Sequence, residues 1–82
     1  MFEIIRKEML AGDTVLMEIT APRIAKSALP GQFLIVRVDE KGERIPLTIS
    51  DFDVNKGTVV IVFKVIGKTT TDMSRLEVGE CL

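Results

Sequence analysis

The heptapeptide Arg44-Ile45-Pro46-Leu47-Thr48-Ile49-Ser50 decides the fold of this chain, and it lies between two strongly apolar runs. It places a cation, a proline and two hydroxyls in what the pattern predicts to be a strand. Proline cannot donate to a sheet ladder, so it belongs at an edge or near a strand start. An arginine followed by hydroxyls suits an anionic group such as phosphate. The heptapeptide therefore indicates either a ligand-binding strand or an edge strand with a solvated arginine.

The composition indicates one small globular domain over residues 1–82, because the 46% hydrophobic content is sufficient for a packed core. The net charge is −1 and there is no basic stripe, so nucleic acid is not an expected partner. No apolar run approaches the ~20 residues of a membrane span, and the N-terminus has no signal-peptide pattern. The sequence predicts a cytoplasmic protein that has no membrane partner.

Several residue types that carry chemistry are absent from the sequence. There is no His, which is the commonest general base and metal ligand, and there is no Tyr or Trp. With Cys81 as the single cysteine, neither an internal disulfide nor a thiolate metal cluster can form, and Cys81 is expected to be a buried strand residue. No catalytic residue and no metal site are therefore predicted, and any chemistry has to come from a bound cofactor.

Five segments have the pattern of β-strands. Alternation is clearest where Val15, Met17 and Ile19 share one face. The segment at residues 33–38 is rich in branched residues and is expected to be buried on both faces over part of its length. Because Pro22 and Pro30 bracket residues 23–29, those residues are expected to form a loop. The predicted strands cover residues 2–9, 14–20, 33–38, 44–50 and 58–66.

One short helix is expected over residues 68–76, where threonines can cap the start and Met73 and Leu76 share a face. Polar loops that contain glycine, at residues 39–43 and 51–57, join the strands before it. Residues 77–80 turn toward a further strand that has barely begun at Leu82. These elements favour a mainly β, antiparallel small barrel with its last strand truncated. Such a barrel has an open edge that can recruit another chain, including a second copy by strand exchange.

A second candidate site lies where the last long strand meets the helix. Phe63-Lys64-Val65 ends the strand, and Gly67 and a threonine run follow. Free N–H groups and the helix dipole at such a junction suit an anion, and Thr69 and Thr70 add hydroxyl donors. The alternative is a capped helix whose threonines serve only the cap.

Four motifs together resemble a known family. In chain order they are Pro30-Gly31-Gln32-Phe33, the heptapeptide, a strand that runs on through Gly67-Lys68-Thr69-Thr70, and Leu76-Glu77-Val78-Gly79-Glu80. Over nearly the whole chain they resemble the flavin-binding domain of the ferredoxin–NADP reductase superfamily. The resemblance is closer to its electron-transfer subunits, those of dihydroorotate dehydrogenase and of NADH-dependent ferredoxin–NADP oxidoreductase, also called sulfide dehydrogenase subunit beta.

The resemblance implies a six-stranded antiparallel Greek-key barrel that binds FAD. Arg44 would hold the pyrophosphate, and the strand after it would contact the isoalloxazine and ribityl groups. The broader superfamily has an aromatic residue where Pro46 stands, and this sequence departs from it as the electron-transfer subunits do. The Gly67-Lys68-Thr69-Thr70 stretch is less glycine-rich than in the dihydroorotate dehydrogenase subunits, which favours the sulfide dehydrogenase branch. The implied cofactor-binding residues are Arg44, Pro46, Leu47, Thr48, Phe63, Lys64, Val65, Thr69 and Thr70.

The function implied by the resemblance is that of an FAD-binding portion of a flavin-dependent oxidoreductase, which is not a complete enzyme by itself. The flavin would relay electrons between a nicotinamide nucleotide and an iron–sulfur centre, and the partners would be other domains or subunits that carry iron–sulfur clusters. The alternative is a non-catalytic β-barrel interaction module that binds no cofactor and oligomerises through its open edge.

Overall fold

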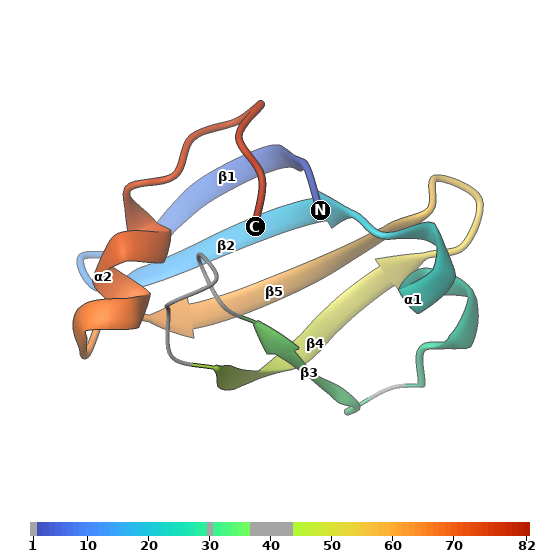
Figure 1. The fold of residues 1–82 in the computed structure, drawn as a ribbon, viewed down its shortest axis with the longest axis horizontal. Coiled ribbons are helices and arrows are strands. Elements are labelled where there is room, and N and C mark those ends of the chain that lie inside the picture. The colour runs from blue at the N-terminus through green and yellow to red at the C-terminus, as the bar shows by residue number, and fades with distance from the viewer. Residues whose placement is uncertain (1, 30, 37–43) are drawn as a thin grey trace.

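The computed structural model describes residues 2–29, 31–36 and 44–82, which form a twisted antiparallel sheet with two short helices (Figure 1). The order of the strands in the sheet is β1-β2-β5-β4-β3, which places β2 beside β5 in the manner of a Greek key. Neither helix in these ranges has the length or the apolar character needed to cross a membrane. The elements are β1 (Ile4–Ala11), β2 (Thr14–Thr20), α1 (Pro22–Ser27), β3 (Phe33–Val36), β4 (Ile45–Asp53), β5 (Thr58–Lys64) and α2 (Lys68–Ser74).

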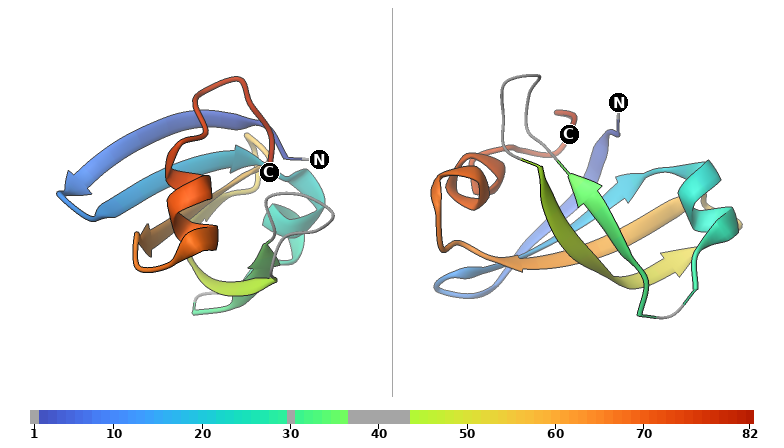
Figure 2. Two further views of the ribbon diagram at one scale, coloured as in Figure 1. Left: turned by 60° about the vertical axis from the view of Figure 1, so that its left-hand side comes forward. Right: turned by 60° about the horizontal axis from the view of Figure 1, so that its bottom comes forward.

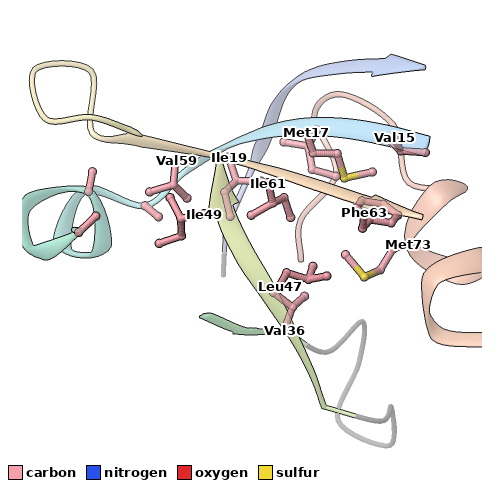
Figure 3. Packing of buried hydrophobic residues seen from close by; sticks show 14 residues of the cluster. Val15, Met17, Ile19, Val36, Leu47, Ile49, Val59, Ile61, Phe63 and Met73 are labelled. Atoms are coloured by element: carbon pink, nitrogen blue, oxygen red, sulfur yellow. The ribbon is translucent and has the colours of Figure 1, made fainter. Parts of the chain in front are cut away.

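The predicted alternation along β2 is confirmed, and it sets the inner face of the sheet. Val15, Met17 and Ile19 are at most 1% exposed, and they face one core cluster to which every strand and both helices contribute. The only α2 residue in this cluster is Met73, whose side chain points toward Phe63 of β5 (Figure 3). The mainly β, antiparallel character of the predicted fold is therefore confirmed, and the core lies on one face of the sheet.

Residues 22–27 form a helix, so the prediction of a loop there and of a single helix in the chain is wrong. Pro22 stands in the first turn of α1, where proline is favourable because its fixed φ suits a helix start and its missing N–H is not needed there. Ala25, which is fully buried, anchors this turn to the core. A proline at position 30 comes three residues after the helix ends and does not interrupt it.

β3 is buried on one face only, contrary to the prediction of two buried faces. Val36 is in the core and Leu34 packs against it, whereas Phe33 and Ile35 are exposed. The reason is that the sheet has its core on one face, and no described element packs against the other face of β3. The predicted end of this strand at residues 37–38, the hairpin loop at 39–43 and Pro30 of the first motif lie outside the described residues.

The end of the chain pairs with the start of β1. The N–H of Ile4 donates to the carbonyl of Glu80 at 2.8 Å, and the N–H of Leu82 donates to the carbonyl of Phe2 at 2.9 Å. Cys81 lies opposite Glu3 in a single bridge and is exposed, so the prediction that it is buried is wrong. The described strands form an open five-stranded sheet, with this short pairing beside β1.

Candidate functional site

A groove with a volume of about 520 Å³ opens between the start of β4, the end of β5 and the segment that leads into α2. It brings together two stretches that lie about twenty residues apart in the sequence. The described residues that line it are Ile45, Pro46, Leu47, Thr48, Val62, Phe63, Lys64, Ile66, Gly67, Lys68, Thr69 and Thr70.

The groove exists because β4 changes its partner along its length. Residues 45–48 pair with β3, whereas the ladder between β4 and β5 runs only from Ile49 to Asp53. A register shift between Ile49 and Asp51 marks the change, and such bulges bend a strand. β5 meanwhile stays paired with β2 as far as Lys64. The two strands therefore diverge (Figure 2). The residues that line the groove come from both sides of this divergence.

The backbone of β4 presents polar groups to this gap. The N–H of Ile49 donates to the carbonyl of Gln32 at 2.8 Å, so the backbone groups of Ile49 point toward the β3 side. Because these directions alternate along a strand, the N–H and C=O of Thr48 and the C=O of Pro46 point the other way, toward β5. The ladder with β5 begins at the pair of Ile49 with Ile61, and because the N–H of Ile49 points to β3, the carbonyl of Thr48 belongs to the first bond of that ladder. The open edge of β4 thus offers one donor, the Thr48 N–H, and one acceptor, the Pro46 C=O, to the groove.

The side chains around the groove differ in character from one end to the other. Leu47 and Phe63 are buried in the core and form its inner wall. Lys64 and Lys68 are exposed and lie at the end near α2, where Lys68 Nζ is 3.9 Å from Asp72 Oδ2. The lining residues include no carboxylate and no histidine. The groove can therefore bind a ligand with apolar and anionic parts, but it holds no acid–base pair of its own.

Thr70 serves the cap of α2. Its Oγ1 accepts hydrogen bonds from the N–H groups of Ile66 (2.9 Å) and Gly67 (3.0 Å) and donates to the carbonyl of Gly67 at 3.1 Å. At the other end of the helix, Lys7 Nζ donates to the carbonyl of Ser74 at 2.7 Å. These contacts favour the capping interpretation for Thr70, because its hydroxyl already has three partners.

The structure brings most of the predicted site residues together. Arg44 and Val65 are the exceptions among them. Arg44 is exposed just before β4 and is not among the lining residues, and Val65 packs against the core while its N–H donates to the carbonyl of Asp13 at 2.7 Å. The predicted residues that line the groove are Pro46, Leu47, Thr48, Phe63, Lys64, Thr69 and Thr70.

Sequence reasoning missed Ile45, Val62, Ile66, Gly67 and Lys68 as lining residues. Strand alternation offered a signal for Val62, which shares a face with Lys64. The others lie beside predicted residues, and only the divergence of β4 from β5 exposes them to the groove.

The one strongly paired carboxylate of the described residues lies away from the groove. Glu18 of β2 accepts a hydrogen bond from Thr58 Oγ1 at 2.7 Å and another from Arg6 Nε at 3.1 Å. The hydrogen bond from Thr58 is the main cause that lowers the pKa of Glu18, and the guanidinium of Arg6 adds to it against the opposing effect of burial. Thr58 begins β5, whereas the groove lies at the end of that strand, so this network is structural.

No protein-family model matches the chain. Among curated proteins, it is 52% identical over 80 residues to a Clostridium beijerinckii protein described only as an uncharacterized protein in the adh 3' region. It is 42% identical over 80 residues to a dihydroorotate dehydrogenase B (NAD(+)) electron transfer subunit homolog of Thermotoga maritima, and 39% identical over 75 residues to the corresponding subunit of Desulforamulus reducens. These matches cover 98%, 98% and 88% of this chain but only 27%, 28% and 29% of the relatives.

A solved structure is similar to this chain to the same extent as the curated electron transfer subunits. One chain from work on flavin-based electron bifurcation by the NADH-dependent reduced ferredoxin–NADP oxidoreductase superposes with a TM-score of 0.95 at 42% identity, over 99% of this chain and 29% of that one. The chain thus spans less than a third of the length of the relatives it matches. Over that part it is homologous to the dihydroorotate dehydrogenase B electron-transfer subunits and to this ferredoxin–NADP oxidoreductase chain, which confirms the resemblance carried by the four motifs.

Proposed function

We propose that this chain is the FAD-binding portion of an electron-transfer oxidoreductase subunit. The observation that carries the proposal is the groove, because it joins the open edge of β4 to the start of α2 with an apolar wall between them. The relatives add support, since two of them are named as electron transfer subunits or their homologs and one belongs to a study of flavin-based electron bifurcation.

The groove has the chemistry that FAD requires. A flavin ring is flat and largely apolar but has a polar edge of alternating donors and acceptors, which the N–H of Thr48 and the carbonyl of Pro46 complement. Leu47 and Phe63 exclude water from the inner side. Lys64 and Thr69 offer charge and hydroxyl groups for the phosphates, and we assign Arg44, which is exposed directly before β4, to the same phosphates. Thr70 contributes by fixing the helix start.

FAD, when bound, supplies the electron-transfer chemistry, and this chain binds and orients it. In the parent assembly we further propose a sixth strand that closes the sheet into a Greek-key barrel, and partner subunits that carry iron–sulfur centres. The electrons would pass between these centres and a nicotinamide nucleotide in the cytoplasm. Val65 belongs to the proposed site only through its place directly after Lys64, where β5 ends.

Titration of the chain with FAD, followed by flavin fluorescence and calorimetry, tests the proposal. Binding is expected at micromolar concentrations. Replacing Arg44 with Ala should weaken FAD and ADP about two- to fivefold, because an exposed ion pair contributes up to about 1 kcal/mol, and should leave riboflavin binding unchanged. Arg23→Ala, at an exposed position in α1, is the matched control and should have no effect. Absence of flavin binding by the unaltered chain at 100-fold higher concentration would reject the proposal.

The alternative, an interaction module that oligomerises through an open edge, has one observation in its favour. Met9 on β1 and Phe33 and Ile35 on β3 are large apolar side chains that are more than half exposed on the two outermost strands. Size-exclusion chromatography with light scattering tests it, and a concentration-independent monomer that binds FAD counts against it.

A further inference from the structure

The outer face of β3 continues the wall of the groove. Phe33 and Ile35 are 61% and 57% exposed, and β3 lies beside the half of β4 that lines the groove (Figure 2). In the register of this pair, Phe33 lies opposite Thr48 and Ile35 lies opposite Pro46. Residues that lie opposite each other in an antiparallel pair share a face of the sheet. Both apolar side chains therefore stand on the same face as two residues of the groove.

The hydrogen bond between Ile49 and Gln32 shows how close these side chains are. It makes Gln32 and Ile49 a hydrogen-bonded pair, so the next pair along, Phe33 with Thr48, is a non-hydrogen-bonded one. In such pairs the Cα atoms are only about 4.5 Å apart and the side chains approach most closely. The same holds for Ile35 with Pro46, which is consistent with proline having no N–H to donate. The ring of Phe33 thus begins directly beside the Thr48 side chain.

Phe33 is also the one aromatic side chain that the described residues present on this face. Phe63 is buried in the core, Phe52 packs against the core, and Phe2 pairs through its backbone with the end of the chain. The cations of the groove lie at the opposite end, on β5 and α2. The extended surface is thus aromatic at the β3 end and cationic at the α2 end.

We propose that Phe33 is a ligand-contacting residue of the flavin site, which forms the outer rim of the part that receives the ring system, with Ile35 beside it. The inference rests on the proposed function and extends it to a strand that lies outside the groove proper. The ring of Phe33, which lies next to Ile35 and beside Thr48, can pack edge-to-face or offset against a second aromatic ring. An exposed phenylalanine on an outermost strand is otherwise a liability for association, which a bound ring would cover.

The test compares three probes on two matched variants. FAD carries both the ring and the phosphates, riboflavin carries the ring alone, and ADP carries the phosphates alone. Phe33→Leu keeps an apolar side chain and removes the ring, and it should weaken riboflavin and FAD by about threefold to tenfold while leaving ADP unchanged. Phe2→Leu makes the same chemical change at the other exposed phenylalanine and should alter none of the three affinities.

Each alternative outcome has a distinct meaning. If Phe33→Leu binds riboflavin and FAD as the unaltered chain does, Phe33 is not part of the site, although the proposed function stands. Equal weakening of ADP shows a general disturbance of the groove and overturns the inference in the same way. A change in oligomeric state with unchanged flavin affinity assigns this face to another protein chain. If the unaltered chain binds no flavin at all, both the inference and the proposed function fail.

Discussion

Replacing Met73 with Ala is expected to destabilise the protein by about 2–5 kcal/mol, the usual cost of deleting a fully buried methionine side chain. Met73 is 0% exposed and is the residue through which α2 enters the core, next to Phe63 (Figure 3). The stability of an 82-residue domain is roughly 4–12 kcal/mol, so this one change should remove a large part of it. Phe63 also lines the groove, so the loss of its neighbour should weaken ligand binding there.

The assay is urea denaturation followed by circular dichroism, with the slope of the transition checked to remain constant. Met9→Ala provides the matched control, because Met9 is 57% exposed on β1 and its truncation should cost less than about 0.5 kcal/mol. Equal effects of the two substitutions would show that α2 is not packed on the sheet as the structure has it. Met73 would then not support Phe63, and the inner side of the groove would not have the packing described above.

Two further substitutions test the turn before β5 and the hydrogen-bonded carboxylate on β2. Gly57→Ala should destabilise the fold by about 1–2 kcal/mol in thermal denaturation, because φ is +70° there and the new Cβ would lie 3.0 Å from Pro22 Cβ, whereas Gly12→Ala, in open space, should not. Glu18→Gln should cost stability at neutral pH but little in acid: the pKa of Glu18 is lowered in the folded state, so its contribution is present above the ordinary glutamate pKa of about 4.3 and is lost as the pH falls below it. A stability difference between Glu18→Gln and the unaltered chain that stays constant from pH 7 to pH 3 would contradict this.

The parts of the fold that the sequence predicts well are those set by local pattern. β2 has the bounds that alternation predicts, Thr14–Thr20, because one face is fully apolar. α2 begins at Lys68, directly after the glycine that caps it. The sequence does not predict α1, because Pro22 and Pro30 bracket it and proline ends most helices, although Pro22 stands where a helix start favours it. Local pattern fails there because the same residue can begin a helix or prevent one.

The groove itself could be predicted only in part. The two stretches that line it were identified from residue types, namely Thr48 and its neighbours in one and Lys64, Thr69 and their neighbours in the other. That they face each other across a gap depends on β4 leaving β5 for β3, which is a non-local choice of partner. Burial of β3 on one face is also non-local, since it follows from the core lying on one face of the sheet. Neither fact is encoded in the period of a single strand.

The position of Pro46 shows how closely the strand pairing and the groove depend on each other. Along β4 the backbone of residues 45, 47 and 49 points to β3, and that of 46 and 48 points to the gap. A proline at 45 or 47 would remove a hydrogen bond from the ladder with β3, whereas at 46 it removes a donor that would face the groove. The result is that Thr48 supplies the only backbone N–H from this half of β4 to the groove. Proline, which is poorly suited to a strand, therefore stands where the ladder with β3 loses no hydrogen bond, and it sets the pattern of backbone donors that a ligand meets.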